Sequence, residues 1–152
     1  GAEFPLWFAG IALVAGTASL LNAALVVRLG MRRMVTVTLG VQIALSGGMA
    51  AMSAAGAWPA ALAFPAYLVW TTGVFFMAGM TLGNLNALAL EPVGHIAGMA
   101  ASVVGAISTV AAVMIAVPLG LAFDGTAVPL ATGVAVLAGM AFLLMRTIPP
   151  QT

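Results

Sequence analysis

Four polar side chains gather in one short stretch of an otherwise very apolar chain. Residues 82–102 (LGNLNALALEPVGHIAGMAAS) contain Asn84, Asn86, Glu91 and His95, the only histidine in the sequence. An amide inside an apolar helix needs a hydrogen-bond partner, which can be a neighbouring helix, cavity water or a bound molecule. A carboxylate or an imidazole can carry a proton. The stretch therefore holds groups suited to ligand binding or proton transfer, with ordinary helix packing as the alternative.

The acidic member of this stretch lies close to a basic turn in the predicted topology. Glu91 ends an apolar segment, where its carboxylate can reach water or the turn RLGMRR at residues 28–33. We expect a structural role for it rather than proton transfer, and a solvated or helix-capping role for His95. The predicted latch between helices at this end of the protein consists of Arg28, Gly30, Arg32, Arg33 and Glu91.

Enzyme chemistry and nucleic-acid binding find no support in the sequence. The chain has no cysteine and one histidine, and it lacks the Gly-x-Ser-x-Gly and His-Glu-x-x-His motifs. The sequence therefore lacks the residues needed for nucleophilic catalysis or for a multi-histidine metal centre. We expect no enzyme activity, no metal and no cofactor. Its four basic residues are all arginines and form no long basic run, so we expect no nucleic-acid partner.

The composition is that of a membrane protein. Of the 152 residues, 64% are hydrophobic and 5% are charged, and the mean hydropathy is +1.23. A bilayer core of about 30 Å needs about 20 helical residues. We predict one all-α domain over residues 1–152, a polytopic bundle of five spans at about 4–27, 34–55, 60–90, 96–123 and 128–145. The third span is long and contains Pro65, so we expect it to be tilted or kinked.

The charges predict an orientation for these spans in the bilayer. Alternating five spans places all four arginines (Arg28, Arg32, Arg33 and Arg146) on one side and Glu3 and Asp124 on the other. By the positive-inside rule the arginine side and the C-terminus face the cytoplasm. The N-terminus then starts outside without a signal sequence to carry it there. We therefore expect that further helices precede this chain in a longer protein.

Small residues at a spacing of three or four predict a helix-packing face. In lipid, such residues let two helices approach closely. The fourth predicted span carries Gly94, Gly98, Ser102 and Gly105, and the third carries Gly79 and Gly83. Generic tight packing is the alternative to any more specific role. The first and fourth spans are similarly rich in small residues, a weak sign of an inverted repeat.

Two motifs resemble a transporter family. LNALALEPVGHIAGMAASVVGAI (residues 85–107) resembles the junction of the tenth and eleventh helices in the Bcr/CflA drug-resistance branch of the major facilitator superfamily. LLNAALVVRLGMRRM (residues 20–34) is similar to that branch's loop between the eighth and ninth helices. The resemblance covers nearly the whole chain, which corresponds to helices eight to twelve of that family. The chain departs from the family at GNLNA, where members often have Pro-Asn, and in the absence of helices one to seven.

The resemblance implies proton-coupled export of small hydrophobic drugs by alternating access. It implies a bacterial inner membrane as the location, with lipid, a drug-like substrate, protons and the missing N-terminal helices as partners. The coupling acids of the family lie largely in those missing helices. Candidate cavity residues here are Asn84, Thr81, Met77, Gly73, Tyr67, Trp70 and Asn22. For the aromatic residues, plain packing is an equal alternative.

Within this set, Asn84 is predicted to face the cavity, because it shares a helix face with Thr81, Met77 and Gly73. Asn86, about 200° away around the helix, is predicted to face a neighbouring helix. A non-transporting five-span assembly or scaffold protein is the alternative function.

Overall fold

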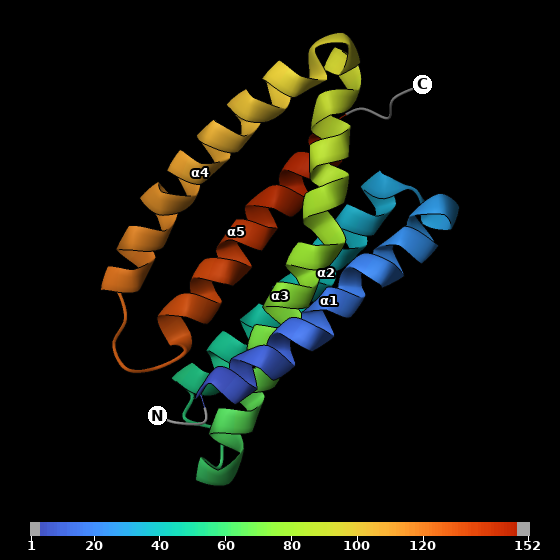
Figure 1. Cartoon of the computed structure of the whole chain (residues 1–152). Coiled ribbons are helices and arrows are strands. Elements are labelled where there is room, and N and C mark those ends of the chain that lie inside the picture. The colour runs from blue at the N-terminus through green and yellow to red at the C-terminus, as the bar shows by residue number, and fades with distance from the viewer. Residues whose placement is uncertain (1–3, 149–152) are drawn as a thin grey trace.

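The computed structural model describes residues 4–148, and these form helices and no strands. The elements are α1 (Phe4–Leu29), α2 (Met31–Ala54), α3 (Ala60–Leu90), the short 3-10 helix η1 (Glu91–Ile96), α4 (Ala97–Leu121) and α5 (Val128–Thr147) (Figure 1). The all-α prediction is confirmed for this part of the chain. The predicted positions of Glu3 and of the C-terminal residues 149–152 lie outside the described residues.

The number of helices that could cross a membrane differs from the prediction. Four continuous helical stretches are long and apolar enough, not five, because Ala60–Leu121 forms one stretch of 62 residues. The 3-10 helix η1 joins α3 to α4 without an unstructured linker, so the two helices belong to one continuous stretch. Val93 nevertheless has the non-helical angles φ −119° and ψ 30°. Figure 1 shows that the chain turns back between α3 and α4, so that the two helices form a hairpin.

The reversal between α1 and α2 depends on one glycine. Gly30 is the only residue between the two helices and has φ 78° and ψ 149°. Residues with a Cβ atom avoid this region, so the turn can be this short only with glycine. Its carbonyl accepts a hydrogen bond from the Met34 N–H at 3.1 Å, which starts α2. The turn therefore holds Arg28, Arg32 and Arg33 at one end of the bundle.

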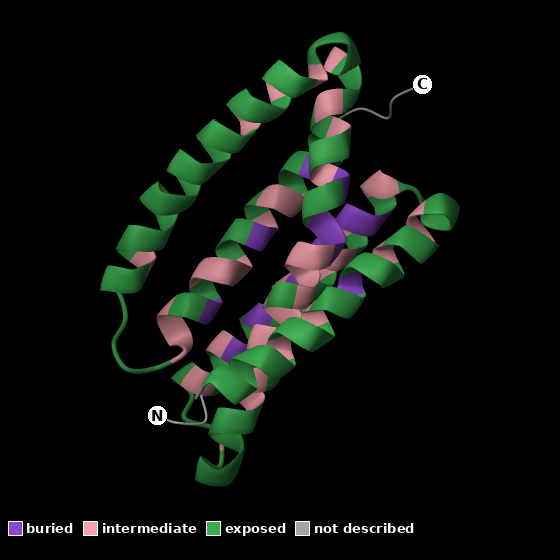
Figure 2. Ribbon diagram, in the orientation of Figure 1, coloured by how far each residue is buried: buried purple, intermediate pink, exposed green. Residues whose placement is uncertain are grey.

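The core lies where α2 and α3 meet their neighbours. One buried cluster joins α2 to α5 and contains Val35, Leu39, Ala138 and Met145. A second joins α1, α2 and α3 through Ala18, Met34 and Met80, and a third joins α2, α3 and α5 through Met49, Trp70 and Ala131. Figure 2 shows the buried positions on these four helices. The bundle is thus built on the contacts of α1 with α3, of α2 with α3 and of α2 with α5.

Helix α4 differs from the others because none of its residues is buried. Figure 2 shows it as a mostly exposed helix set apart from the core. The predicted packing stripe begins in η1 at Gly94 and continues into the first half of α4, yet a Cβ atom added at Gly94, Gly98 or Gly105 would meet nothing within 4 Å. Ser102 is exposed as well. Among the described residues, the stripe has no helix packed against it.

Candidate functional site

The first polar site is a pair of asparagine side chains between α1 and α3. The Asn84 Nδ2 donates to Asn22 Oδ1 at 2.6 Å and to the Met80 carbonyl oxygen at 2.9 Å. The Asn22 Nδ2 lies 3.5 Å from Asn84 Oδ1, which closes a reciprocal amide pair. Asn84 is buried, with 4% of its surface exposed. The pair satisfies two amides that would otherwise be costly inside apolar helices.

This geometry differs from the arrangement predicted for the two asparagines of α3. Asn84 faces α1 and lines neither of the two cavities described below, whereas Asn86 is exposed. The physical reason is the position of α1, which packs on the face of α3 that carries Asn84. The signal was present in the sequence, since Asn22 is an amide within an apolar segment and needs a hydrogen-bond partner.

A second polar network lies between α2 and α3, and its central residue, Ser46, is not among the predicted site residues. Ser46 Oγ accepts hydrogen bonds from Gln42 Nε2 at 2.8 Å and from Trp70 Nε1 at 3.0 Å. Gln42, Ser46 and Trp70 are all buried. The Tyr67 ring lies 5.8 Å from the Trp70 ring, measured between centroids, at an angle of 44°. Trp70 and Tyr67 therefore pack between helices and line neither cavity. The spacing of Gln42 and Ser46, four residues apart, was the available signal.

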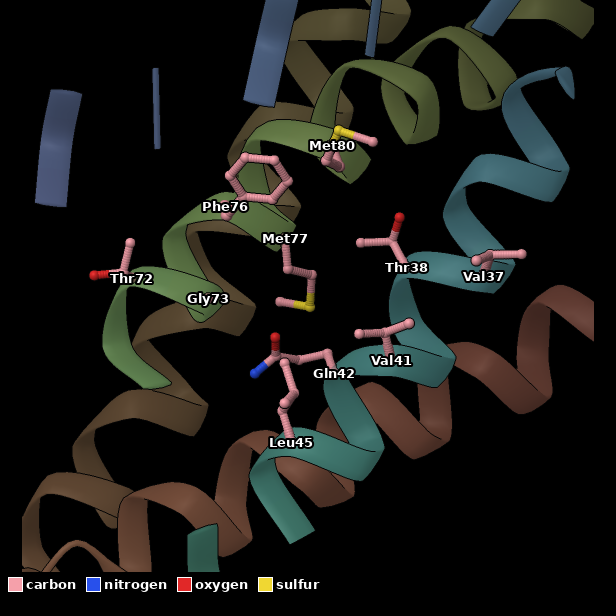
Figure 3. A pocket seen from close by; sticks show the side chains of 10 residues that line it. All are labelled: Val37, Thr38, Val41, Gln42, Leu45, Thr72, Gly73, Phe76, Met77 and Met80. Carbon is pink, nitrogen blue, oxygen red and sulfur yellow. The ribbon is translucent and has the colours of Figure 1, made fainter. Parts of the chain in front are cut away.

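The first cavity lies beside this network, between α2 and α3, and has a volume of about 390 Å³. Figure 3 shows side chains from both helices around it, with Gln42 and Met77 directed into the space between them. Two of the predicted cavity residues, Gly73 and Met77, line it. Thr81 does not, because it is buried and its hydroxyl donates to the Met77 carbonyl oxygen at 2.8 Å. The complete lining is Val37, Thr38, Val41, Gln42, Leu45, Thr72, Gly73, Phe76, Met77 and Met80.

The chemistry of this cavity is uncharged and mostly apolar. Its polar side chains are those of Thr38, Gln42 and Thr72, and no charged residue lines it. Gly73 leaves room on the α3 side, since a Cβ atom added there would lie 3.8 Å from Leu45 Cδ1. Such a site can hold a small neutral molecule through apolar contacts and one or two hydrogen bonds.

The second cavity, of about 810 Å³, lies at the end of the bundle that carries the basic turn. It brings together four of the five predicted latch residues, since Gly30, Arg32, Arg33 and Glu91 all line it. Arg28 is exposed and is not part of the lining. Arg32 also donates from its guanidinium to the Met145 carbonyl oxygen at 2.9 Å and to that of Ile148. It thereby ties the start of α2 to the end of α5.

Neither cavity offers metal-ligand chemistry. Within residues 4–148, no three histidine, cysteine, aspartate or glutamate side chains gather closely enough to hold a metal ion.

Comparison with known proteins gave no family model, curated protein or solved structure that matches the chain significantly. The transporter resemblance therefore rests on the two motifs quoted above.

Proposed function

We propose that this chain is the C-terminal part of a proton-coupled multidrug exporter of the major facilitator type, placed in a bacterial inner membrane and working by alternating access. The observation that carries the proposal is the uncharged cavity between α2 and α3. The two motifs at residues 20–34 and 85–107 support it independently. The substrate is a small hydrophobic drug, and the coupling acids belong to the missing N-terminal helices.

The cavity suits such a substrate in size and polarity. Its volume of about 390 Å³ falls within the range of about 300–1,000 Å³ common for small-molecule sites. Val41, Phe76 and Met77 supply apolar contact, and Met77 can adapt its shape to different molecules. Gln42 supplies an amide for orientation. The absence of charge in the lining favours neutral compounds over ions.

In this proposal the chain crosses the membrane five times. The reversal at η1 divides the long stretch Ala60–Leu121 into two crossings, α3 and α4. The basic turn and Glu91 then lie in the cytoplasm, and Asp124 lies outside. Cysteines replacing Arg32 and Asp124 one at a time should react with membrane-impermeant thiol reagents from opposite sides. Labelling of both positions from the same side would exclude this topology.

The exposed surface of α4 fits a chain that works together with further helices. Its small residues can accept another helix at close range. Such a surface would also suit the alternative, a five-span scaffold protein that binds other membrane proteins. The two functions differ in whether drug moves across the membrane.

The deciding experiment measures drug export by the full-length protein in a bacterium that lacks its own exporters. We expect increased resistance to chloramphenicol-like or bicyclomycin-like compounds, and loss of this export when a protonophore removes the proton gradient. Gly73→Leu should fill the cavity and lower resistance at unchanged protein level. Gly83→Leu on the same helix is the control, because open space surrounds Gly83. Unchanged drug accumulation in cells with the full-length protein would favour the scaffold alternative.

A further inference from the structure

The cavity at the arginine end of the bundle has a composition that drug export does not explain. It combines charged side chains with a long apolar wall, whereas the cavity between α2 and α3 has no charge. We propose that it binds an anionic phospholipid, with the phosphate held by the basic turn and an acyl chain along the apolar wall. This inference requires that the chain spans a bilayer but does not depend on transport.

The charges around the cavity favour a phosphate group. Arg32 and Arg33 line it, and Glu91 is the only acid in the lining. Arg28 adds a third cation in the last turn of α1, across the reversal at Gly30. Arg33 and Arg28 are exposed, so their guanidinium groups, with five N–H donors each, are accessible to a ligand. Positive charge therefore exceeds negative charge at this end of the bundle.

The remaining lining favours a lipid over a free phosphate ion. Leu29, Val37, Leu85, Leu88 and Met145 form an apolar wall next to the arginines. A free phosphate ion would gain nothing from these side chains, whereas an acyl chain would remove them from water. The cavity also lies where α1, α3 and α5 end and α2 begins. In a membrane protein this is the level of the lipid headgroups.

One of the arginines that line this cavity is already engaged by the end of α5. Arg32 is held by the Met145 and Ile148 carbonyl oxygens. Its charge contributes to the site while its position stabilises the bundle. Arg33 and Arg28 are therefore the groups whose replacement tests lipid binding with the least effect on the fold.

The test measures lipid binding to the full-length protein in detergent by native mass spectrometry. Phosphatidylglycerol and phosphatidylcholine with the same acyl chains are compared. We expect preferential binding of phosphatidylglycerol, reduced about fivefold by Arg33→Gln and further by Arg28→Gln, since a basic residue near anionic lipid contributes about 1 kcal/mol. Glu91→Gln should have the opposite effect and raise the preference. Arg146→Gln is the matched control, because Arg146 lies 5.9 Å above the Phe142 ring and outside the cavity lining.

Two competing ligands distinguish a lipid phosphate from a free phosphate ion. Glycerol phosphate and inorganic phosphate at equal ionic strength should fail to displace phosphatidylglycerol at millimolar concentration. Displacement by either would overturn the lipid assignment in favour of a free phosphate site. Equal binding of the two lipids, or an equal effect of Arg146→Gln and Arg33→Gln, would overturn a specific site here. None of these readouts depends on drug export, so the two proposals fail separately.

Discussion

The Asn84 side chain lies 2.6 Å from Asn22 Oδ1, although the two residues are 62 positions apart in the chain. This contact joins α1 to α3 within an apolar environment, where a hydrogen bond has little competition from water. The helices also approach closely at Gly79, where an added Cβ atom would lie 2.8 Å from Ala18 Cβ. The same two helices are thus joined by a hydrogen bond and by a close backbone contact. These two contacts lie about one and a half turns apart along α3.

The asparagine pair should contribute measurably to stability. In a double-mutant cycle of Asn22→Ala and Asn84→Ala, we expect a coupling energy of about 0.6–1.7 kcal/mol, the range for hydrogen bonds between membrane helices. The measurement is thermal unfolding of the protein in detergent. Asn86→Ala is the control and should leave the melting temperature nearly unchanged, because Asn86 is exposed. Additive effects of the two substitutions would contradict the bond.

The close approach of α1 and α3 predicts different effects at two glycines of α3. Gly79→Ala should destabilise the protein by about 1–3 kcal/mol, because the new methyl group meets Ala18 Cβ and lies 3.3 Å from the Ala15 carbonyl oxygen. Gly83→Ala adds the same methyl group where nothing lies within 4 Å, so it should be neutral or slightly stabilising. Comparison of the two unfolding curves checks the prediction, and equal losses would contradict the helix crossing seen here.

Ser46 should be a sensitive position despite its small size. Ser46→Ala removes the acceptor used by both Gln42 and Trp70, which are buried. A buried donor without an acceptor costs about 1–3 kcal/mol, so a clear drop in thermal stability is expected. Ser102→Ala on α4 is the matched control, because the Ser102 hydroxyl is exposed and bonds only to Gly98 in its own helix. A fully stable Ser46→Ala protein would show that this network is unimportant.

The turn before α5 predicts a pH effect at one exposed carboxylate. The Thr126 hydroxyl and backbone N–H donate to Asp124 Oδ1 at 2.6 Å and 2.9 Å, and these bonds lower the pKa of Asp124 below its usual value. A lowered pKa means that the carboxylate stabilises the folded turn above the usual pKa of about 3.9. This contribution is lost as the pH falls through the lower, folded value.

The matched variant is Asp124→Asn. The native protein should be more stable than the variant near pH 7, and the difference should shrink as the pH falls below about 4. Thermal unfolding of both proteins across this pH range gives the comparison. A difference that is constant with pH would mean that the charge of Asp124 has no part in holding the turn.

The helical class and most helix ends could be predicted from the sequence. Long apolar segments must become helices in a bilayer, and local residues mark where they stop. Gly30 marks the reversal after α1, and Pro59 precedes the start of α3 at Ala60. The ends predicted at residues 27 and 145 differ by two from the observed Leu29 and Thr147. The sequence placed the junction of α3 and α4 close to its observed position, but it did not show that the 3-10 helix η1 joins the two helices into one continuous stretch.

The partners of individual side chains could not be predicted from the sequence. The helical period placed Asn84 and Asn86 on opposite faces of α3, but the sequence did not specify which face α1 covers. The same applies to Trp70, which the sequence allowed in a cavity and the structure places against Ser46. Helix formation depends on hydrogen bonds between residues four positions apart, so the local sequence determines it. Helix packing depends on contacts between distant segments, here 24 and 62 residues apart, and only the tertiary structure decides them.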